Sequence, residues 1–233
     1  NIRMKFKKHG CMKFIGHLDI MRYFQKAIRR ADIDIAYSEG FSPHMIMSFA
    51  APLGVGLTSE GEYVDLQVNS CVSSKAAVDA LNSVMVDGME VVSFKLLPEN
   101  VKNAMSSVAA ADYFVKWREG YVPENWEEKF NAFLQKEEML IVKKTKRSEA
   151  EVDLKPMLYK TELRDGGIFM QVACGSVNNL KPELVMEAFA KDAGIELAPF
   201  ALEVCRLEVY ADLGDETAKK LVPLEELGED IES

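Results

Sequence analysis

Alternating hydrophobic and polar residues predict a strand at the start of the chain. Ile2, Met4 and Phe6 alternate with three cations over residues 2–7, which is the period-two pattern of a strand with one buried face. Residues 17–31 carry apolar side chains at spacings of three and four, which indicates an amphipathic helix. The first predicted elements are therefore a strand and a helix.

The next segments complete a four-stranded motif. The sequences MIMSFA at 45–50 and EYVDLQV at 62–68 predict two strands joined as a hairpin. Residues 73–85 predict a helix with a serine cap, and MEVVSFKL at 89–96 predicts a fourth strand. The order is βαββαβ, the ferredoxin-like split motif.

A second copy of this order follows a predicted linker at 98–111. Its expected strands lie at 112–118, 140–146, 167–174 and 200–210, and its helices at 123–138 and 181–194. The predicted fold class is α+β, with two tandem ferredoxin-like (βαββαβ) domains that have antiparallel sheets. Their expected bounds are 1–100 and 112–211, and an acidic tail at 212–233 is expected to be loosely held or to form a short helix.

The composition favours a cytoplasmic globular protein. Of the 233 residues, 48% are hydrophobic and 28% are charged, which suits ordinary cores and argues against disorder. No apolar run reaches the ~18 residues that span a bilayer, and the first residues do not resemble a signal peptide. The four cysteines contain no CxxC pair and there are three histidines, so we expect reduced thiols, no metal and no cofactor.

Charge is distributed unevenly along the chain. Residues 1–30 hold nine Lys and Arg against one acid, whereas residues 203–233 hold ten acids against three cations. The net charge of −9 therefore combines a basic start and an acidic end.

Three sequence motifs lie between residues 16 and 63. They read GHLDIMR, AYSEGFSPH and SFAAPLGVGLTSEGEY. Over residues 3–68 this series resembles the radical-SAM-linked protein family of uncharacterised function. The segments VDLKPML at 152–158 and LKPE at 180–183, and the strand around Arg206, are similar to that family's second half.

The resemblance implies a partner and no activity. Members of that family are companions of, or fused to, a cobalamin-binding radical SAM protein, often beside a ribonuclease and ribosomal protein genes, which implies a role in RNA metabolism. This chain has no CxxxCxxC motif, so it lacks the usual ligands of the iron–sulfur cluster of such enzymes. We expect any radical chemistry to belong to the partner.

Two loop regions carry the candidate site residues. The βαββαβ topology predicts that His17, Asp19, Ser59 and Glu60 share one end of the sheet, while the loop with His44 starts from the opposite end. His17 is the candidate catalytic residue, as a general base. A phosphate contact, a helix cap or a packing role are the alternatives.

Basic residues give the strongest indication of RNA binding, because phosphates attract local cationic patches even on an acidic protein. The candidate residues for binding RNA or another ligand are His17, Asp19, Arg22, Lys26, Arg29, Tyr37, Glu39, Phe41, His44, Ser59, Glu60, Lys143, Lys144, Arg147 and Lys155.

The sequence therefore supports three hypotheses. The first is a non-catalytic accessory protein of a radical SAM enzyme that binds RNA or a ribosomal component in RNA modification or processing. The second is a metal-independent endoribonuclease that uses His17. The third is a module for protein–protein interaction only.

Overall fold

The computed structural model of the protein describes residues 1–144 and 149–232, and the chain forms two compact units. The first unit contains Asn1–Ala110 and the residues from Arg206 onward, and the second contains Ala111–Cys205. The chain passes between the units within strands β5 (Val108–Trp117) and β10 (Leu202–Asp212). The boundaries differ from the predicted 1–100 and 112–211 because β10 starts in one unit and ends in the other.

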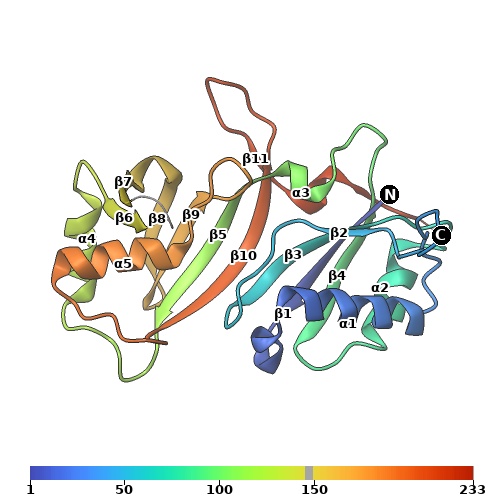
Figure 1. Ribbon diagram of the computed structural model, residues 1–233, viewed down its shortest axis with the longest axis horizontal. Helices are drawn as coiled ribbons and strands as arrows, with labels where there is room; N and C mark the ends of the chain where they lie inside the picture. Colours follow the sequence, from blue (N-terminus) through green and yellow to red (C-terminus); the bar gives the residue numbers. More distant parts are fainter. Residues whose placement is uncertain (145–148, 233) are drawn as a thin grey trace. The chain divides into compact units, whose positions relative to one another are not determined.

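The first unit has the predicted element order βαββαβ (Figure 1). Its elements are β1 (Ile2–Lys8), the short 3-10 helix η1 (Gly10–Phe14), α1 (His17–Arg30), β2 (Met47–Phe49), β3 (Thr58–Leu66), α2 (Ser74–Asn82) and β4 (Met89–Leu96). Strand β1 lies between β4 and β3, and β2 pairs with β3. These pairings are antiparallel.

The core of the first unit lies on the helix-covered face of this sheet. The alternating residues Ile2, Met4 and Phe6 pack with Phe24 and Ile28 of α1 in one cluster of buried side chains. Because successive side chains of a strand point to opposite faces, the cations at positions 3, 5 and 7 of β1 point to the other face.

The acidic C-terminal residues form part of the first unit. Strand β11 (Leu221–Pro223) pairs with β10, the 3-10 helix η3 (Leu224–Leu227) follows, and β12 (Glu229–Asp230) pairs with β4. Leu224 is fully buried. The segment is therefore not loosely held, and the expected short helix is present as the four-residue 3-10 helix η3 between two short strands. Elements of two to four residues are too short to give a periodic signal.

The second unit contains a sheet, two helices and a separate hairpin. The elements after β5 are α4 (Trp126–Leu134), β6 (Leu140–Lys144), β7 (Glu149–Asp153), η2 (Lys155–Met157), β8 (Leu158–Arg164), β9 (Gly167–Ala173) and α5 (Pro182–Ala193). The short helix α3 (Ala104–Ser107) precedes β5. Strand β9 lies between β5 and β8. Phe130 of α4 and Phe189 of α5 stack edge to face at 5.0 Å between ring centres.

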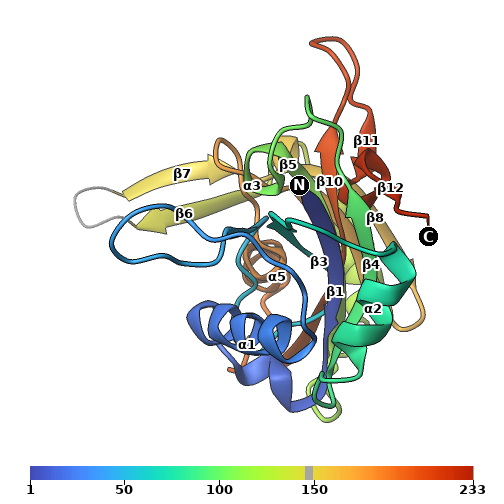
Figure 2. The same cartoon turned by 90° about the vertical axis from the view of Figure 1, so that its right-hand side faces the viewer.

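One predicted strand of the second unit is placed differently. Residues 140–144 pair only with β7 in a two-stranded ribbon (Figure 2), and residues 145 and 146 lie outside the described part. The antiparallel partner of β9 is β8, through a turn in which Asp165 and Gly166 both have positive φ. This two-residue turn favours a tight hairpin. Charged residues occupy every second position in the second half of β8, so its sequence did not predict a strand with a buried face.

The structure is thus a mixed α+β fold with few helices and mostly antiparallel strands. Within its described residues no helix has both the length and the apolar character needed to cross a bilayer.

A matched pair of glycine substitutions tests the connection between β1 and β4. Gly88 and Gly56 have nearly equal φ values of +89° and +90°, but only at Gly88 would an added Cβ approach a backbone atom, the His9 carbonyl oxygen, at 2.5 Å. We expect Gly56→Ala to lower the free energy of unfolding by about 1 kcal/mol and Gly88→Ala by about 3 kcal/mol. Urea unfolding measures both, and equal losses would contradict the close approach.

Candidate functional site

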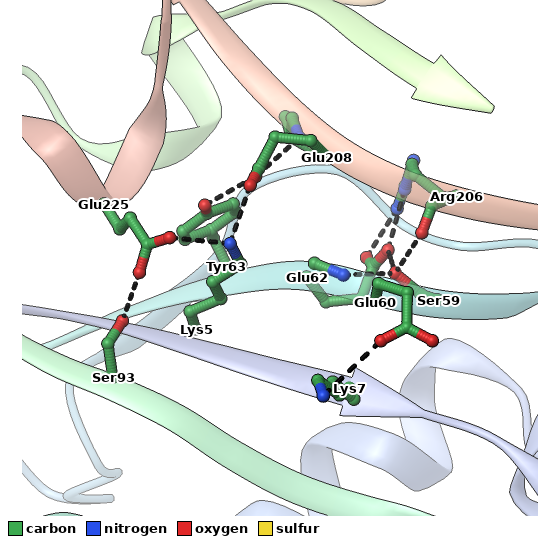
Figure 3. A network of polar contacts seen from close by, with 12 residues as sticks. Lys5, Lys7, Ser59, Glu60, Glu62, Tyr63, Ser93, Arg206, Glu208 and Glu225 are labelled. Carbon is green, nitrogen blue, oxygen red and sulfur yellow. Dashed lines mark hydrogen bonds and ion pairs between the residues drawn. The ribbon is translucent and has the colours of Figure 1, made fainter. Parts of the chain in front are cut away.

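Three cations of β1, Arg3, Lys5 and Lys7, lie on the face of the first unit's sheet opposite α1 and α2, and carboxylates neutralise each of these three. Figure 3 shows the contacts of Lys5 and Lys7. The ion pairs are Arg3 with Asp65, Lys5 with Glu208 and Glu225, and Lys7 with Glu60 and Glu90. Two of these carboxylates come from the acidic C-terminal region. The basic start and the acidic end of the chain therefore pair with each other.

Lys5 is the centre of the largest group of contacts. Its ammonium lies 2.6 Å from a carboxylate oxygen of Glu208 and 2.6 Å from one of Glu225. Tyr63 donates its hydroxyl to Glu208, and Ser93 donates to Glu225. Burial lowers the pKa of Lys5, but the two carboxylates outweigh it and raise the pKa above its ordinary value. Burial, with the charge of Glu208, raises the pKa of Tyr63, so Lys5 stays charged and Tyr63 neutral at pH 7.

A second ion pair is almost completely buried. Arg206 of β10 donates to both oxygens of Glu62 on β3, at 2.7 and 2.5 Å, and to the Ala51 carbonyl at 2.8 Å. The Ser59 hydroxyl donates to Glu62 at 2.7 Å and is itself fully buried. Ser59, a candidate for ligand binding, is thus part of a structural ion pair and is inaccessible to RNA.

A small cavity lies beside this pair. Lys8, His17 and Glu62 line it together with apolar residues, and its volume of about 20 Å³ suits roughly one water molecule. Lys8 is 2% exposed, and burial lowers its pKa, although the charge of Glu62 opposes this. The His17 ring packs edge-on against Phe49 at 5.2 Å. This cavity is too small for a nucleotide.

His17 is the first helical residue and not the cap. Gly16 occupies the N-cap position of α1 and makes no side-chain hydrogen bond, so the capping alternative for His17 is wrong. The loop that leads into α1 and the loop between β2 and β3 meet at this end of the sheet, as the predicted topology requires. Gly56 of the second loop donates its N–H to the Lys13 carbonyl of the first at 2.7 Å. Glu60 belongs to the same end, where it pairs with His9 at 2.9 Å.

The loop with the YSEGFSPH motif is held separately from His17. Isolated bridges join Ile35 to Val68, just beyond the end of β3, and Tyr37 to Met45. The His44 ring contacts the Ser38 hydroxyl at 2.9 Å within the same loop. The structure thus places His17 and His44 in different surroundings. Glu39 and Phe41 are exposed between these contacts, and Tyr37 is 47% exposed.

The C-terminal half of α1 presents cations to solvent. Arg22 forms an exposed pair with Asp19 at 3.2 Å. Lys26, Arg29 and Arg30, the α1 cation group, are exposed, and no side-chain contact is found for them within the described residues. The chain goes from Arg30 through a short turn to the loop at 37–45, so the end of α1 and this loop are adjacent along the chain, at the same end of the first unit (Figure 1).

The remaining candidates belong to the second unit. Lys143 and Lys144 end β6, and Arg147 lies outside the described residues. Lys155 is half-buried, and its ammonium donates to the Lys136 carbonyl. Among the residues that the structure describes, no group of three or more His, Cys, Asp or Glu side chains could hold a metal ion.

Sequence patterns missed three residues of these sites. By the alternation of β1, Lys8 lies on the same face as the hydrophobic residues at positions 2, 4 and 6, and its side chain is buried there at the end of the strand. Arg206 and Glu62 are 144 positions apart, and no local pattern links them. The sequence indicated Arg206 only through its place in an alternating strand that resembles the family's second half.

The chain belongs to the family described as "Uncharacterized protein conserved in bacteria (DUF2344)", whose model matches residues 1–182. No curated protein matches it. Among solved structures, it is similar to a chain of "Crystal Structure of a Cbf5-Nop10-Gar1 Complex", with 11% identity and a TM-score of 0.44. That match covers 89% of this chain and 48% of the other, so this chain spans about half the length of that relative.

The buried pair of Glu62 and Arg206 makes a testable prediction about stability. Arg206→Met leaves the Glu62 carboxylate buried without its cation, and we expect the free energy of unfolding to fall by about 3–5 kcal/mol at pH 7. The double variant Glu62→Leu/Arg206→Met removes both charges and should recover at least half of that loss. Urea unfolding measures both variants. A loss below about 1 kcal/mol for the single variant would show that the pair is not structural.

Proposed function

We propose that the protein is a non-catalytic accessory protein that binds single-stranded RNA and presents it to a radical SAM enzyme. The observation that carries the RNA part is the contrast between two sets of cations. Three cations of β1, at positions 3, 5 and 7, are neutralised by carboxylates, whereas Lys26, Arg29 and Arg30 are exposed and free of such contacts within the described residues. The binding surface is the α1 cation group together with the loop at 37–45.

The exposed aromatic residues support a single-stranded ligand. Phe41 is fully exposed and Tyr37 is about half exposed, in the loop that follows α1. Large aromatic side chains at a surface offer stacking platforms for unpaired bases, while neighbouring cations contact the phosphates. This combination suits a strand whose bases are unpaired better than it suits a duplex.

The partner is inferred from the sequence motifs. The resemblance of residues 3–68 to the radical-SAM-linked family favours a radical SAM enzyme as partner, and the missing CxxxCxxC motif assigns the iron–sulfur cluster to that enzyme. The strand orders β4-β1-β3-β2 and β10-β5-β9-β8 support two ferredoxin-like motifs, with the β6–β7 hairpin as an insertion in the second.

A charge-reversal variant tests RNA binding. In Lys26→Glu/Arg29→Glu/Arg30→Glu, we expect affinity for short single-stranded RNA to fall at least tenfold and the slope of log affinity against log salt to shrink by roughly 2, since about three phosphate contacts are lost. Fluorescence anisotropy over a salt series measures both. The matched control reverses the charge of three exposed lysines of the second unit, Lys129, Lys181 and Lys191. It should retain more of the wild-type affinity for RNA than the α1 variant does.

Stability must be measured in the same variants, because basic residues in the last turn also stabilise the helix dipole. Equal effects of the two triple variants would contradict a specific role for α1. The assay also addresses the nuclease hypothesis, which the position of His17 beside Lys8 and Glu62 favours. RNA cleavage in EDTA that disappears in His17→Ala would replace the accessory role with catalysis. We expect the RNA to remain intact.

A pull-down from the native cell tests the partner. Affinity purification after nuclease treatment should recover a protein with an iron–sulfur cluster, identified by mass spectrometry and by its absorbance. If that enzyme is recovered but the protein does not bind RNA, the result would support a module for protein–protein interaction only. Failure to recover it from treated and untreated lysates would remove the radical SAM enzyme from the proposal.

A further inference from the structure

A cavity of about 200 Å³ lies beside β2 in the first unit. Its walls come from β2 and its preceding residue, from the end of β3, and from the segment between β4 and α3. Ile46, Leu97 and Val101 supply apolar surface, and Ser48, Gln67 and Asn103 supply hydrogen-bonding groups. Ile46 comes directly after the bridge that closes the loop at 37–45.

The hydrogen-bonding groups of this cavity are neutral and largely unused. Within the described residues, no hydrogen bond is found for the side chains of Ser48 and Gln67. The Asn103 side chain accepts from the Ser106 N–H at 2.9 Å through its oxygen, which leaves its NH₂ group to donate. Cross-strand pairing puts Ser48 opposite Asp65, so the hydroxyl points to the face of the sheet opposite α1 and α2.

The one carboxylate of the cavity is already neutralised. Asp65 accepts two hydrogen bonds from Arg3, at 2.8 and 2.9 Å, and a third from the Ala104 N–H at 2.6 Å. Arg3 in turn is fully buried. The side chains that line the cavity, including that of Asn1, therefore offer neither a free cation for a phosphate nor a free anion for an amine.

We infer that this cavity binds a single nucleobase, and on the proposed function the base belongs to the bound RNA. Aliphatic walls suit the two faces of a flat heterocycle, and a carboxamide such as Gln67 offers a donor and an acceptor to its edge, as amides do in reading bases. The volume is below the roughly 300–1,000 Å³ of sites for larger ligands, which limits the occupant to one ring system.

Two pocket variants and one control test this inference. The wild type should prefer one of the short homopolymers of A, C and U by about tenfold in fluorescence anisotropy. Gln67→Leu removes the amide and Val101→Trp fills the cavity, and both should reduce the preference below about twofold without changing the salt slope. Gln135→Leu, at an exposed glutamine of the second unit, should retain the preference. Thermal unfolding checks that each variant is folded.

A second arm with free nucleosides separates this inference from the RNA proposal. If RNA binds with a steep salt dependence but the pocket variants keep the wild-type base preference, the nucleobase site is overturned and RNA binding stands. If nucleosides bind the wild type but not Val101→Trp, while RNA does not bind, the site is a nucleoside site and the RNA proposal fails. If neither RNA nor nucleosides bind, both are wrong.

Discussion

The first unit depends on charge pairing between segments that are far apart in the sequence. Lys5 on the first strand is held by Glu208 and Glu225 near the C-terminus, and Arg206 is held by Glu62. These groups are largely buried, so each charge requires its partner: an unpaired charge in such surroundings costs several kcal/mol. The C-terminal segment therefore belongs to the same folded unit as the N-terminal strand, and a chain without residues 206–232 would leave Lys5 without either carboxylate and Glu62 without Arg206.

This pairing decides which cations remain available to a ligand. The sequence suggested a basic module over residues 1–30, but its strand cations are neutralised within the unit, and the exposed remainder lies mainly on α1. Local potential, and not the net charge of −9, governs contact with phosphates within roughly 10 Å at moderate salt. In the proposed function, the acidic net charge is therefore no obstacle to RNA contact through the α1 cation group, with Tyr37 and Phe41 in the loop that follows α1 and the cavity at β2 next along the chain.

The sequence predicted those parts of the fold that carry a repeated local pattern. The βαββαβ order of the first unit follows from the alternation in β1 and from the stripe on α1 through Phe24 and Ile28. Strand β8 was missed because charged residues alternate along it, and β11 and β12 because they span so few residues. Alternation places Lys8 on the core-facing side of β1 with the hydrophobic residues at positions 2, 4 and 6, but a lysine there breaks the hydrophobic pattern, so its burial was not predicted. The contact between Arg206 and Glu62 is set by tertiary structure alone, as is the cavity beside β2, whose walls come from separate segments.

Hydrogen–deuterium exchange with and without a short single-stranded RNA tests the central claim most directly, because it locates the binding surface without any substitution. We expect slower exchange in the peptides that cover residues 26–48, from the α1 cation group through the loop at 37–45 to β2. We expect no change in β1, where carboxylates already pair with the cations at positions 3, 5 and 7. Protection confined to the second unit, or protection of β1 together with faster exchange in residues 221–230, would contradict it, since RNA would then bind elsewhere or would displace the C-terminal carboxylates.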